Sequence, residues 1–179
     1  MIFRETPLSG AFLVEPERRE DDRGFFARTW CADEYTRRGL DPRIQQCSIS
    51  ANSRRGTLRG MHWQAAPHLE AKTVRCTAGR IHDVIVDLRP ESETRLRWFA
   101  VELSAENRLA LYVPPLFAHG FITLADGSEV EYAISTPYVA EAARGLRWDD
   151  PVIGIEWPLE PTTISGRDRS FPLLERTRA

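Results

Sequence analysis

The stretch GTLRGMHWQAAPHLEAKTVR, residues 56–75, decides the fold that we predict for this chain. It contains two short runs that alternate between apolar and polar residues, separated by a turn that contains proline, and this pattern is typical of a β-hairpin. With a period of two, His62 shares a face of the first strand with Leu58, and Lys72 shares a face of the second strand with Val74. A buried charge must be paired or hydrated, so a base and a cation on apolar faces predict a polar pocket inside the fold.

Lys72 is the only lysine among the 24 lysine and arginine residues of the chain. A chain that keeps a single lysine can use it as a compact point charge with rotatable donors, which arginine does not supply. Alternatively, its stem packs on the sheet and its ammonium reaches the solvent. The face that it shares with Val74 favours the pocket.

Short runs rich in β-branched and aromatic residues extend outward from this hairpin, from residue 43 to residue 136. Tight turn signals separate them, including Asp126-Gly127, and no helical segment intervenes. This spacing favours an antiparallel sandwich or barrel over an α/β fold. The predicted strands lie near 44–51, 57–64, 71–77, 80–88, 97–103, 109–113, 118–124 and 129–135.

The chain is long enough for one domain with a substantial core, and we predict a single domain over residues 1–179. Residues 1–42 form an N-terminal arm with a short helix at 32–38, and residues 43–136 form the barrel core. Residues 137–179, interrupted by prolines, are expected as loops and short helices that cap the barrel and shape the entrance to a ligand site.

Phe25 and Phe26 are adjacent and follow a charged segment of the predicted arm. Two neighbouring phenylalanines require burial, either in this core or against a partner chain. The arm is therefore a candidate subunit contact.

The composition argues against several classes of protein. No stretch approaches the about 20 apolar residues of a membrane helix, and the first residues lack the order of a signal peptide, so we expect a cytoplasmic protein. The three cysteines show no metal-ligand spacing and are expected to be reduced thiols. A net charge of −2 provides no electrostatic footprint for nucleic acid.

Four polar side chains are expected on the inward faces of the strands: His62, Lys72, His119 and Tyr132. Each alone is commonly structural. Together they provide a base, a cation and an acid, the set that removes and returns a proton next to a carbonyl. Arg59 lies in the same strand as His62 and could bind an anion. A carboxylate partner for the base is expected among the aspartates near the C-terminus, without a choice between them.

Metal catalysis is the rival chemistry, since His62, Glu70 and His119 could supply three ligands. In barrels of this kind two histidines commonly stand one residue apart on a strand, and Gln64 occupies the second of these positions. Lys72 would also repel a cation. We therefore predict a site without metal or cofactor.

Several long segments in this order resemble the dTDP-4-dehydrorhamnose 3,5-epimerase family, over residues 23–172. The resemblance implies a cupin-type antiparallel jelly-roll barrel with short peripheral helices, mainly C-terminal, and a homodimer. It also implies epimerisation of a nucleotide-linked 4-keto-6-deoxyhexose at C3, C5 or both. The nucleotide is expected to be dTDP. The segments are GTLRGMHWQ, EAKTVRCTAGRIHDVIVDLRPES, PPLFAHGFITL, SEVEYAIST, GLRWDDPVIGIEWP and SGRDRSFP.

The same resemblance implies site residues. His62 matches the base and Asp168 its carboxylate partner, Lys72 matches the cation that stabilises the enolate, and Tyr132 matches the acid. Glu70 is left at the edge of the pocket with no role. The predicted substrate-binding residues are Arg23, Phe25, Gln46, Ser48, Arg59, His119, Tyr138 and Arg167, and the segment of Arg23 and Phe25 is expected to reach the neighbouring subunit's nucleotide.

Three positions depart from the family pattern: Arg28 replaces a glutamate, Ser48 an asparagine and Arg167 a lysine. These positions concern nucleotide contacts, so they leave the nucleotide open, and the sequence does not decide which sugar carbons are inverted. A metal-dependent cupin oxygenase or isomerase and a non-catalytic sugar-nucleotide binding module remain alternatives. Binding alone would not need both His62 and Tyr132.

Overall fold

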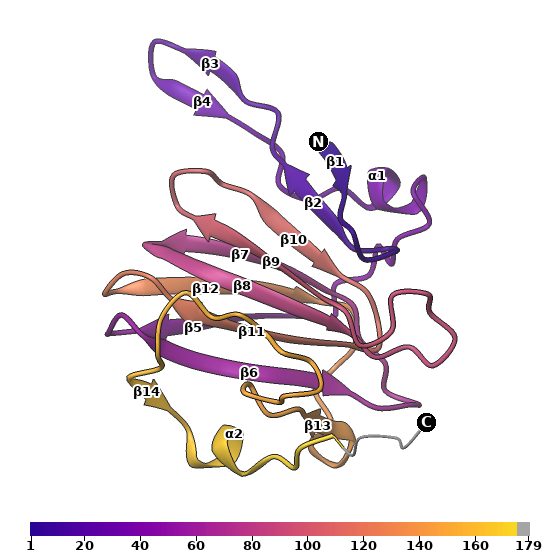
Figure 1. Ribbon diagram of the computed structural model, residues 1–179. Helices are drawn as coiled ribbons and strands as arrows, with labels where there is room; N and C mark the ends of the chain where they lie inside the picture. The colour runs from indigo at the N-terminus through magenta and orange to yellow at the C-terminus, as the bar shows by residue number, and fades with distance from the viewer. Residues whose placement is uncertain (175–179) are drawn as a thin grey trace.

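The computed structural model describes residues 1–174, which form two facing antiparallel β-sheets with a hairpin arm and a C-terminal cap (Figure 1). The first sheet has the order β1-β2-β10-β7-β12-β5, and the second has the order β13-β6-β11-β8-β9, with β14 beside β6. From β5 to β12 the chain passes back and forth between the sheets, which is the connectivity of a jelly roll. The prediction of an all-β, cupin-type jelly roll is confirmed. The strands are β1 (Ile2–Glu5), β2 (Phe12–Glu15), β3 (Arg19–Asp21), β4 (Gly24–Phe26), β5 (Gln46–Asn52), β6 (Thr57–Gln64), β7 (Lys72–Ala78), β8 (Arg80–Asp87), β9 (Trp98–Ser104), β10 (Ala110–Val113), β11 (Phe117–Thr123), β12 (Ser128–Ile134), β13 (Ala143–Gly145) and β14 (Thr163–Ile164).

The eight predicted strands correspond to β5 through β12, and the predicted N-terminal helix corresponds to α1 (Ala32–Thr36). The hairpin predicted for residues 56–75 is wrong: β6 pairs with β11, β13 and β14 in the second sheet, whereas β7 pairs with β10 and β12 in the first. The chain crosses from one sheet to the other between β6 and β7. The cap contains the short helices η1 (Ala140–Ala142) and α2 (Gly166–Ser170), as expected. The division into arm, core and cap stays a prediction, and its last residues, 175–179, lie outside the described part of the chain. No helix within residues 1–174 is long and apolar enough to cross a membrane.

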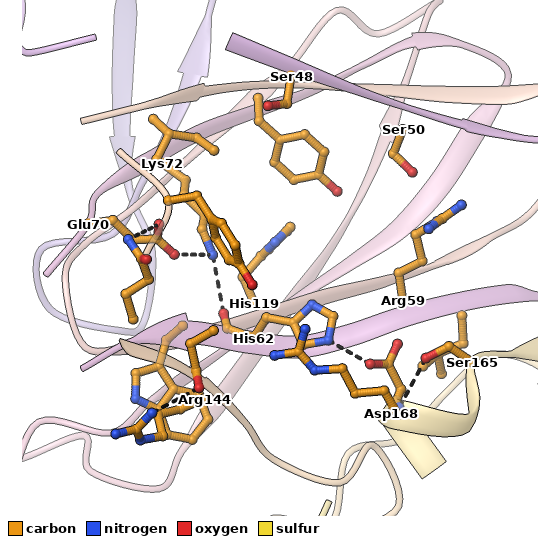
Figure 2. A pocket seen from close by; sticks show the side chains of 18 of the residues that line it. Ser48, Ser50, Arg59, His62, Glu70, Lys72, His119, Arg144, Ser165 and Asp168 are labelled. Carbon is orange, nitrogen blue, oxygen red and sulfur yellow. Dashed lines mark hydrogen bonds and ion pairs between the residues drawn. The ribbon is translucent and has the colours of Figure 1, made fainter. Parts of the chain in front are cut away.

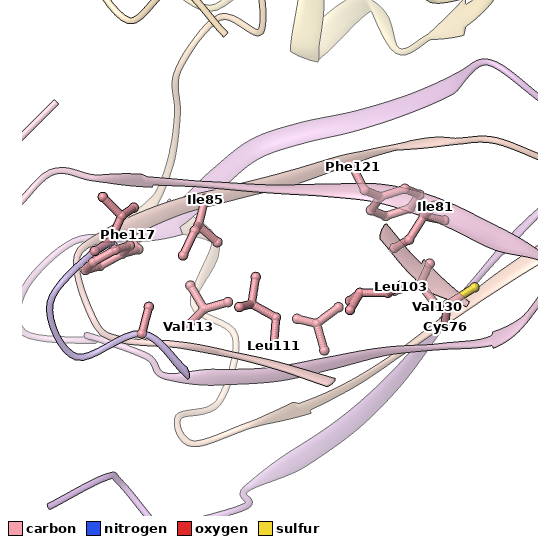
Figure 3. Close-up of a cluster of buried hydrophobic side chains, with 12 residues drawn as sticks. Cys76, Ile81, Ile85, Leu103, Leu111, Val113, Phe117, Phe121 and Val130 are labelled. Atoms are coloured by element: carbon pink, nitrogen blue, oxygen red, sulfur yellow. The ribbon is translucent and has the colours of Figure 1, made fainter. Parts of the chain in front are cut away.

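Apolar side chains fill the side of the barrel that lies between β7, β8, β10 and β11 (Figure 3). Val74 is fully buried there, which confirms the inward face predicted for β7. The opposite side, between β5 and β6, carries polar residues instead. The principal core residues are Leu8, Val74, Cys76, Ile81, Ile85, Leu103, Leu111, Val113, Phe117, Phe121 and Val130.

The pairing of β6 with β11 contains an irregularity that corrects the strict alternation predicted for β6. His62 pairs with His119 and Arg59 pairs with Phe121, so β6 advances three residues where β11 advances two. Such a bulge shifts the side-chain parity, and Arg59 and His62 both line the same cavity instead of lying on opposite faces.

Gly60 makes this bulge possible. Its φ is +140°, and a Cβ atom on it would lie 2.5 Å from the Cα atom of Gly120 on β11. A Cβ atom on Gly120 would in turn lie 2.8 Å from the carbonyl oxygen of Arg59. Only glycine at both positions allows the two backbones to approach this closely.

We expect Gly60→Ala to lower the free energy of unfolding by about 3 kcal/mol, because a backbone clash is added to an unfavourable positive φ. Gly154→Ala is the matched control: Gly154 also has a positive φ, +65°, but its added Cβ would meet no atom within 4 Å beyond its chain neighbours. That variant should lose only about 1 kcal/mol. Urea unfolding measures both values, and equal losses would show that the close approach does not require glycine at position 60.

Candidate active site

A cavity of about 710 Å³ opens between the two sheets on the side of β5 and β6 (Figure 2). Its volume lies in the range of small-molecule sites. Inward side chains of β5, β6, β7 and β12 form its walls, and residues of β13 and α2 close one side. All four predicted catalytic residues and six of the eight predicted binding residues line it: His62, Lys72, Tyr132, Asp168, Gln46, Ser48, Arg59, His119, Tyr138 and Arg167.

His62 and Asp168 are in direct contact. The distance from His62 Nε2 to Asp168 Oδ1 is 2.7 Å, and the backbone N–H of Gly60 donates to the other carboxylate oxygen at 3.4 Å. Ser165 caps α2 by accepting the backbone N–H of Asp168, which fixes where the carboxylate projects. No hydrogen bond within residues 1–174 involves Nδ1 of His62, so this nitrogen is available to a ligand.

The environment of Asp168 keeps it ionised. Burial alone would raise the pKa of this carboxyl group, but the hydrogen bond and charge of His62 and the Gly60 N–H outweigh burial and hold the pKa below its ordinary value. An ionised aspartate orients the imidazole and stabilises its protonated form. Only the family resemblance indicated Asp168; residue patterns alone could not select it, because Asp149 and Asp150 also lie in the C-terminal region. The structure separates them: Asp149 pairs with Arg147, and Asp150 accepts backbone N–H groups within the cap.

Phe171 contacts the His62 ring from a second direction, a contact that was not predicted from the sequence. The two rings pack edge to face with centroids 5.9 Å apart. Phe171 is seated over Gly145, where a Cβ atom would lie 2.0 Å from the phenyl ring. Gly145 pairs with His62 across β13 and β6, so the space for Phe171 is set by the strand that also carries the base.

Lys72 lies inside the cavity, as predicted. Its Nζ atom is 2.9 Å from Oε1 of Glu70 and donates to the carbonyl oxygen of His62 at 3.2 Å. The side chains of Lys72 and Glu70 are only 10% and 9% exposed. Glu70, which the sequence left without a role at the pocket edge, lines the cavity, and its carboxylate is buried against the lysine (Figure 2).

Tyr132 reaches the cavity from β12, beside a second histidine–aspartate pair. His119 packs edge to face on the Tyr132 ring at 5.9 Å, and its Nε2 atom lies 2.8 Å from Oδ1 of the fully buried Asp83. The other oxygen of Asp83 is buried and has no hydrogen-bond partner within the described residues. Burial, and secondarily the charge of Asp83, raise the pKa of Tyr132 well above its ordinary value, against an opposing effect of Arg59. The phenol is therefore a proton donor at physiological pH.

Arginines provide the cationic part of the cavity wall. Arg59 donates from Nε to the side chain of Asn52 at 2.8 Å, which leaves the rest of its guanidinium for an anion. Arg167 and Arg144 also line the cavity, and Arg144 was not predicted. Gln46 accepts the backbone N–H of Tyr138 at 2.9 Å and links β5 to the cap.

Two predicted binding residues, Arg23 and Phe25, do not line this cavity. They belong to the β3–β4 hairpin, which extends away from the two sheets (Figure 1). Arg23 pairs with Asp21, and the Phe25 ring lies between the guanidinium groups of Arg18 and Arg108. Contact with a neighbouring subunit's site stays a prediction.

The three side chains considered as metal ligands have other partners. Glu70 pairs with Lys72. Nε2 of His62 contacts Asp168, and Nε2 of His119 contacts Asp83. Within residues 1–174 no cluster of three or more histidine, cysteine, aspartate or glutamate side chains could hold a metal ion.

Comparison with known proteins extends the similarity over nearly the whole chain. A family model described as dTDP-4-dehydrorhamnose 3,5-epimerase matches residues 5–176. A dTDP-4-dehydrorhamnose 3,5-epimerase of Methanothermobacter thermautotrophicus is 44% identical, and the alignment covers 97% of this chain and 95% of the relative.

Solved structures agree in fold as well as in sequence. The dTDP-4-dehydrorhamnose 3,5-epimerase of Bacillus anthracis, with TDP and PPi bound, has a TM-score of 0.92 at 38% identity, covering 97% of this chain and 99% of that one. A 3′-monoepimerase of Streptomyces bikiniensis, in complex with dTDP-quinovose, has a TM-score of 0.86 at 30% identity, covering 94% and 85%. The resemblance found in the sequence is confirmed.

Proposed function

This chain belongs to the dTDP-4-dehydrorhamnose 3,5-epimerase family, an isomerase family, and on that premise we propose that it inverts C3, C5 or both of a dTDP-linked 4-keto-6-deoxyhexose. One observation carries the proposal: an aspartate-bound histidine on one sheet and a protonated tyrosine on the other line the same cavity. Lys72, on the strand next to that of the tyrosine, lines it too and donates to the carbonyl oxygen of the histidine. Inversion requires a base and an acid on opposite sides of the carbon.

In the proposed mechanism His62 removes the proton from C3 or C5, and the electron pair of the C–H bond moves to the C4 oxygen. Asp168 stabilises the imidazolium that forms, at 2.7 Å. Lys72 donates a hydrogen bond to the enolate oxygen, which makes an otherwise very weak carbon acid accessible. Tyr132 then gives its proton to the opposite face of the carbon, and the C4 ketone is restored.

Arginine side chains are proposed to hold the diphosphate. Arg59 and Arg167 line the cavity beside the base and carry planar donor groups that suit phosphate oxygens. Gln46, Ser48, His119 and Tyr138 are proposed to complete substrate binding. Action in the cytoplasm is part of the proposal, and fractionation of the source cells would test it.

A homodimer completes the proposal. Phe26 at the end of the β3–β4 hairpin is 74% exposed, and Phe25 is 40% exposed. An arm that presents adjacent phenylalanines to solvent is expected to be covered by a second copy of the chain, with Arg23 directed to that copy's nucleotide.

The function is tested by incubating the protein with dTDP-4-keto-6-deoxyglucose in deuterated water and following C3 and C5 by NMR. Deuterium is expected at one or both carbons, and the labelled positions define the centres that open. His62→Ala should slow incorporation by roughly 10²–10⁴, the usual contribution of general-base catalysis. Binding without exchange would indicate a non-catalytic module, and exchange abolished by a chelator would indicate metal chemistry.

Tyr132→Phe is expected to separate abstraction from reprotonation. The histidine can still remove a proton and return a deuteron to the same face, so exchange should persist while inversion falls by roughly 10²–10⁴. Because the pKa of Tyr132 is raised, this phenol should not cause a loss of wild-type activity below pH 10. Normal inversion by Tyr132→Phe would remove the acid role.

The arm is tested by mixing two inactive or impaired variants, His62→Ala and Arg23→Ala. If arms cross between subunits, a mixed dimer contains one site with both residues intact, and subunit exchange should restore about a quarter of the sites. The control mixture, His62→Ala with Tyr132→Phe, should restore none, because both residues belong to the same protomer's cavity. Equal activity of the two mixtures would contradict the crossed arm.

A further inference from the structure

We infer that Glu70 is a positioning residue, which holds the ammonium of Lys72 in the place from which it donates a hydrogen bond to the C4 oxygen of the substrate. The inference rests on the proposed function and assigns a role to a side chain that the mechanism above does not use. The observation behind it is the network that joins Glu70, Lys72 and Gln64 on the wall of the cavity (Figure 2).

The donors of Lys72 can be counted. An ammonium group has three N–H donors in a tetrahedral arrangement. One donates to the carbonyl oxygen of His62 at 3.2 Å, and the nitrogen forms an ion pair with Glu70 Oε1 at 2.9 Å. Within residues 1–174 the ammonium makes no other hydrogen bond. The nitrogen is therefore held between these two oxygens, with donors left for the substrate oxygen.

Glu70 is itself held in place. Its second oxygen, Oε2, accepts a hydrogen bond from Gln64 Nε2 at 3.0 Å. Gln64 is 2% exposed, and its own carbonyl oxygen accepts the backbone N–H of Val139 at 2.6 Å. The amide nitrogen is also within 3.2 Å of the carbonyl oxygen of Pro137. The cap therefore fixes Gln64, Gln64 fixes the carboxylate, and the carboxylate fixes the ammonium.

A carboxylate suits this role better than a neutral acceptor. Lys72 has a flexible four-carbon stem, and an ammonium in a largely buried position without a counter-charge would turn toward solvent. Pairing with Glu70 keeps the charge inside the cavity, beside the carbonyl oxygen of His62. The negative charge of Glu70 also weakens the electrostatic stabilisation that the ammonium gives to the enolate. Removing that charge should lower kcat if Glu70 acts mainly by positioning Lys72, and should raise kcat if the weakened stabilisation matters more.

The test compares Glu70→Gln and Glu70→Asp with the wild-type protein in deuterium incorporation and inversion. If positioning dominates, Glu70→Gln should lower kcat by about tenfold to a hundredfold, with KM changed less than about twofold. This loss is smaller than the roughly 10²–10³ that follows removal of an oxyanion donor itself. Glu70→Asp, which keeps the charge but withdraws it from Lys72, should also lower kcat. Glu129→Gln is the matched control, since Glu129 accepts a hydrogen bond from Thr77 on the surface, and its kcat should equal that of the wild-type protein.

A double-mutant cycle shows whether Glu70 acts through the lysine. Lys72→Met removes the ammonium, so adding Glu70→Gln to that background should cause no further loss of kcat. The inference would be overturned if the double variant lost kcat by the product of the two single losses, or if Glu70→Gln alone left kcat unchanged or raised it. Either result would leave the proposed function intact. Absence of deuterium exchange in the wild-type protein would overturn the proposed function and this inference with it. Thermal unfolding of each variant verifies that it is folded.

Discussion

The close approach of the β6 and β11 backbones at Gly60 and Gly120 is the constraint on which the rest of the site depends. It permits the bulge that turns Arg59 and His62 toward one cavity, although strict alternation would separate them. The same segment supplies the Gly60 N–H that contacts the carboxylate of Asp168. A local departure from regular strand geometry thus places the proposed anion-binding group, the proposed base and the carboxylate that contacts it in one site.

The jelly roll supports this departure because its two sides differ. Between β7, β8, β10 and β11 the sheets are joined by close-packed apolar side chains, which stabilise the barrel. Between β5 and β6 the sheets enclose polar side chains that are paired: His119 with Asp83, and Lys72 with Glu70. Buried pairs contribute little net stability, and removing one partner leaves an uncompensated charge. The apolar side therefore provides the stability, and the polar side holds the residues of the proposed mechanism.

Alternation of apolar and polar residues indicates strands and the face on which each side chain lies, but not the contacts between distant segments. Period-two patterns identified β5 through β12, and the parity of Val74 placed Lys72 inside the fold. The bulge was not predictable, because glycine alone does not reveal that a second glycine lies opposite. Asp168 could not be chosen among its neighbours, since its contact with His62 joins segments 106 residues apart. Glu70 was given no role in the proton transfer, because it precedes β7 and has no strand parity. Strands β1 to β4 are four residues or fewer, too short to show a period.

The placement of the proton-transfer groups on different sheets has a consequence for the reaction. His62 and Asp168 are held at β6 by the cap, whereas Tyr132 is held at β12 by the opposite sheet. Their environments also differ: the contact with His62 keeps Asp168 ionised, and burial near Asp83 keeps Tyr132 protonated. A base and an acid with separate supports cannot move together to one face of a sugar ring. On the proposed mechanism, which carbon is inverted therefore depends on how the ring presents C3 and C5 between these two groups.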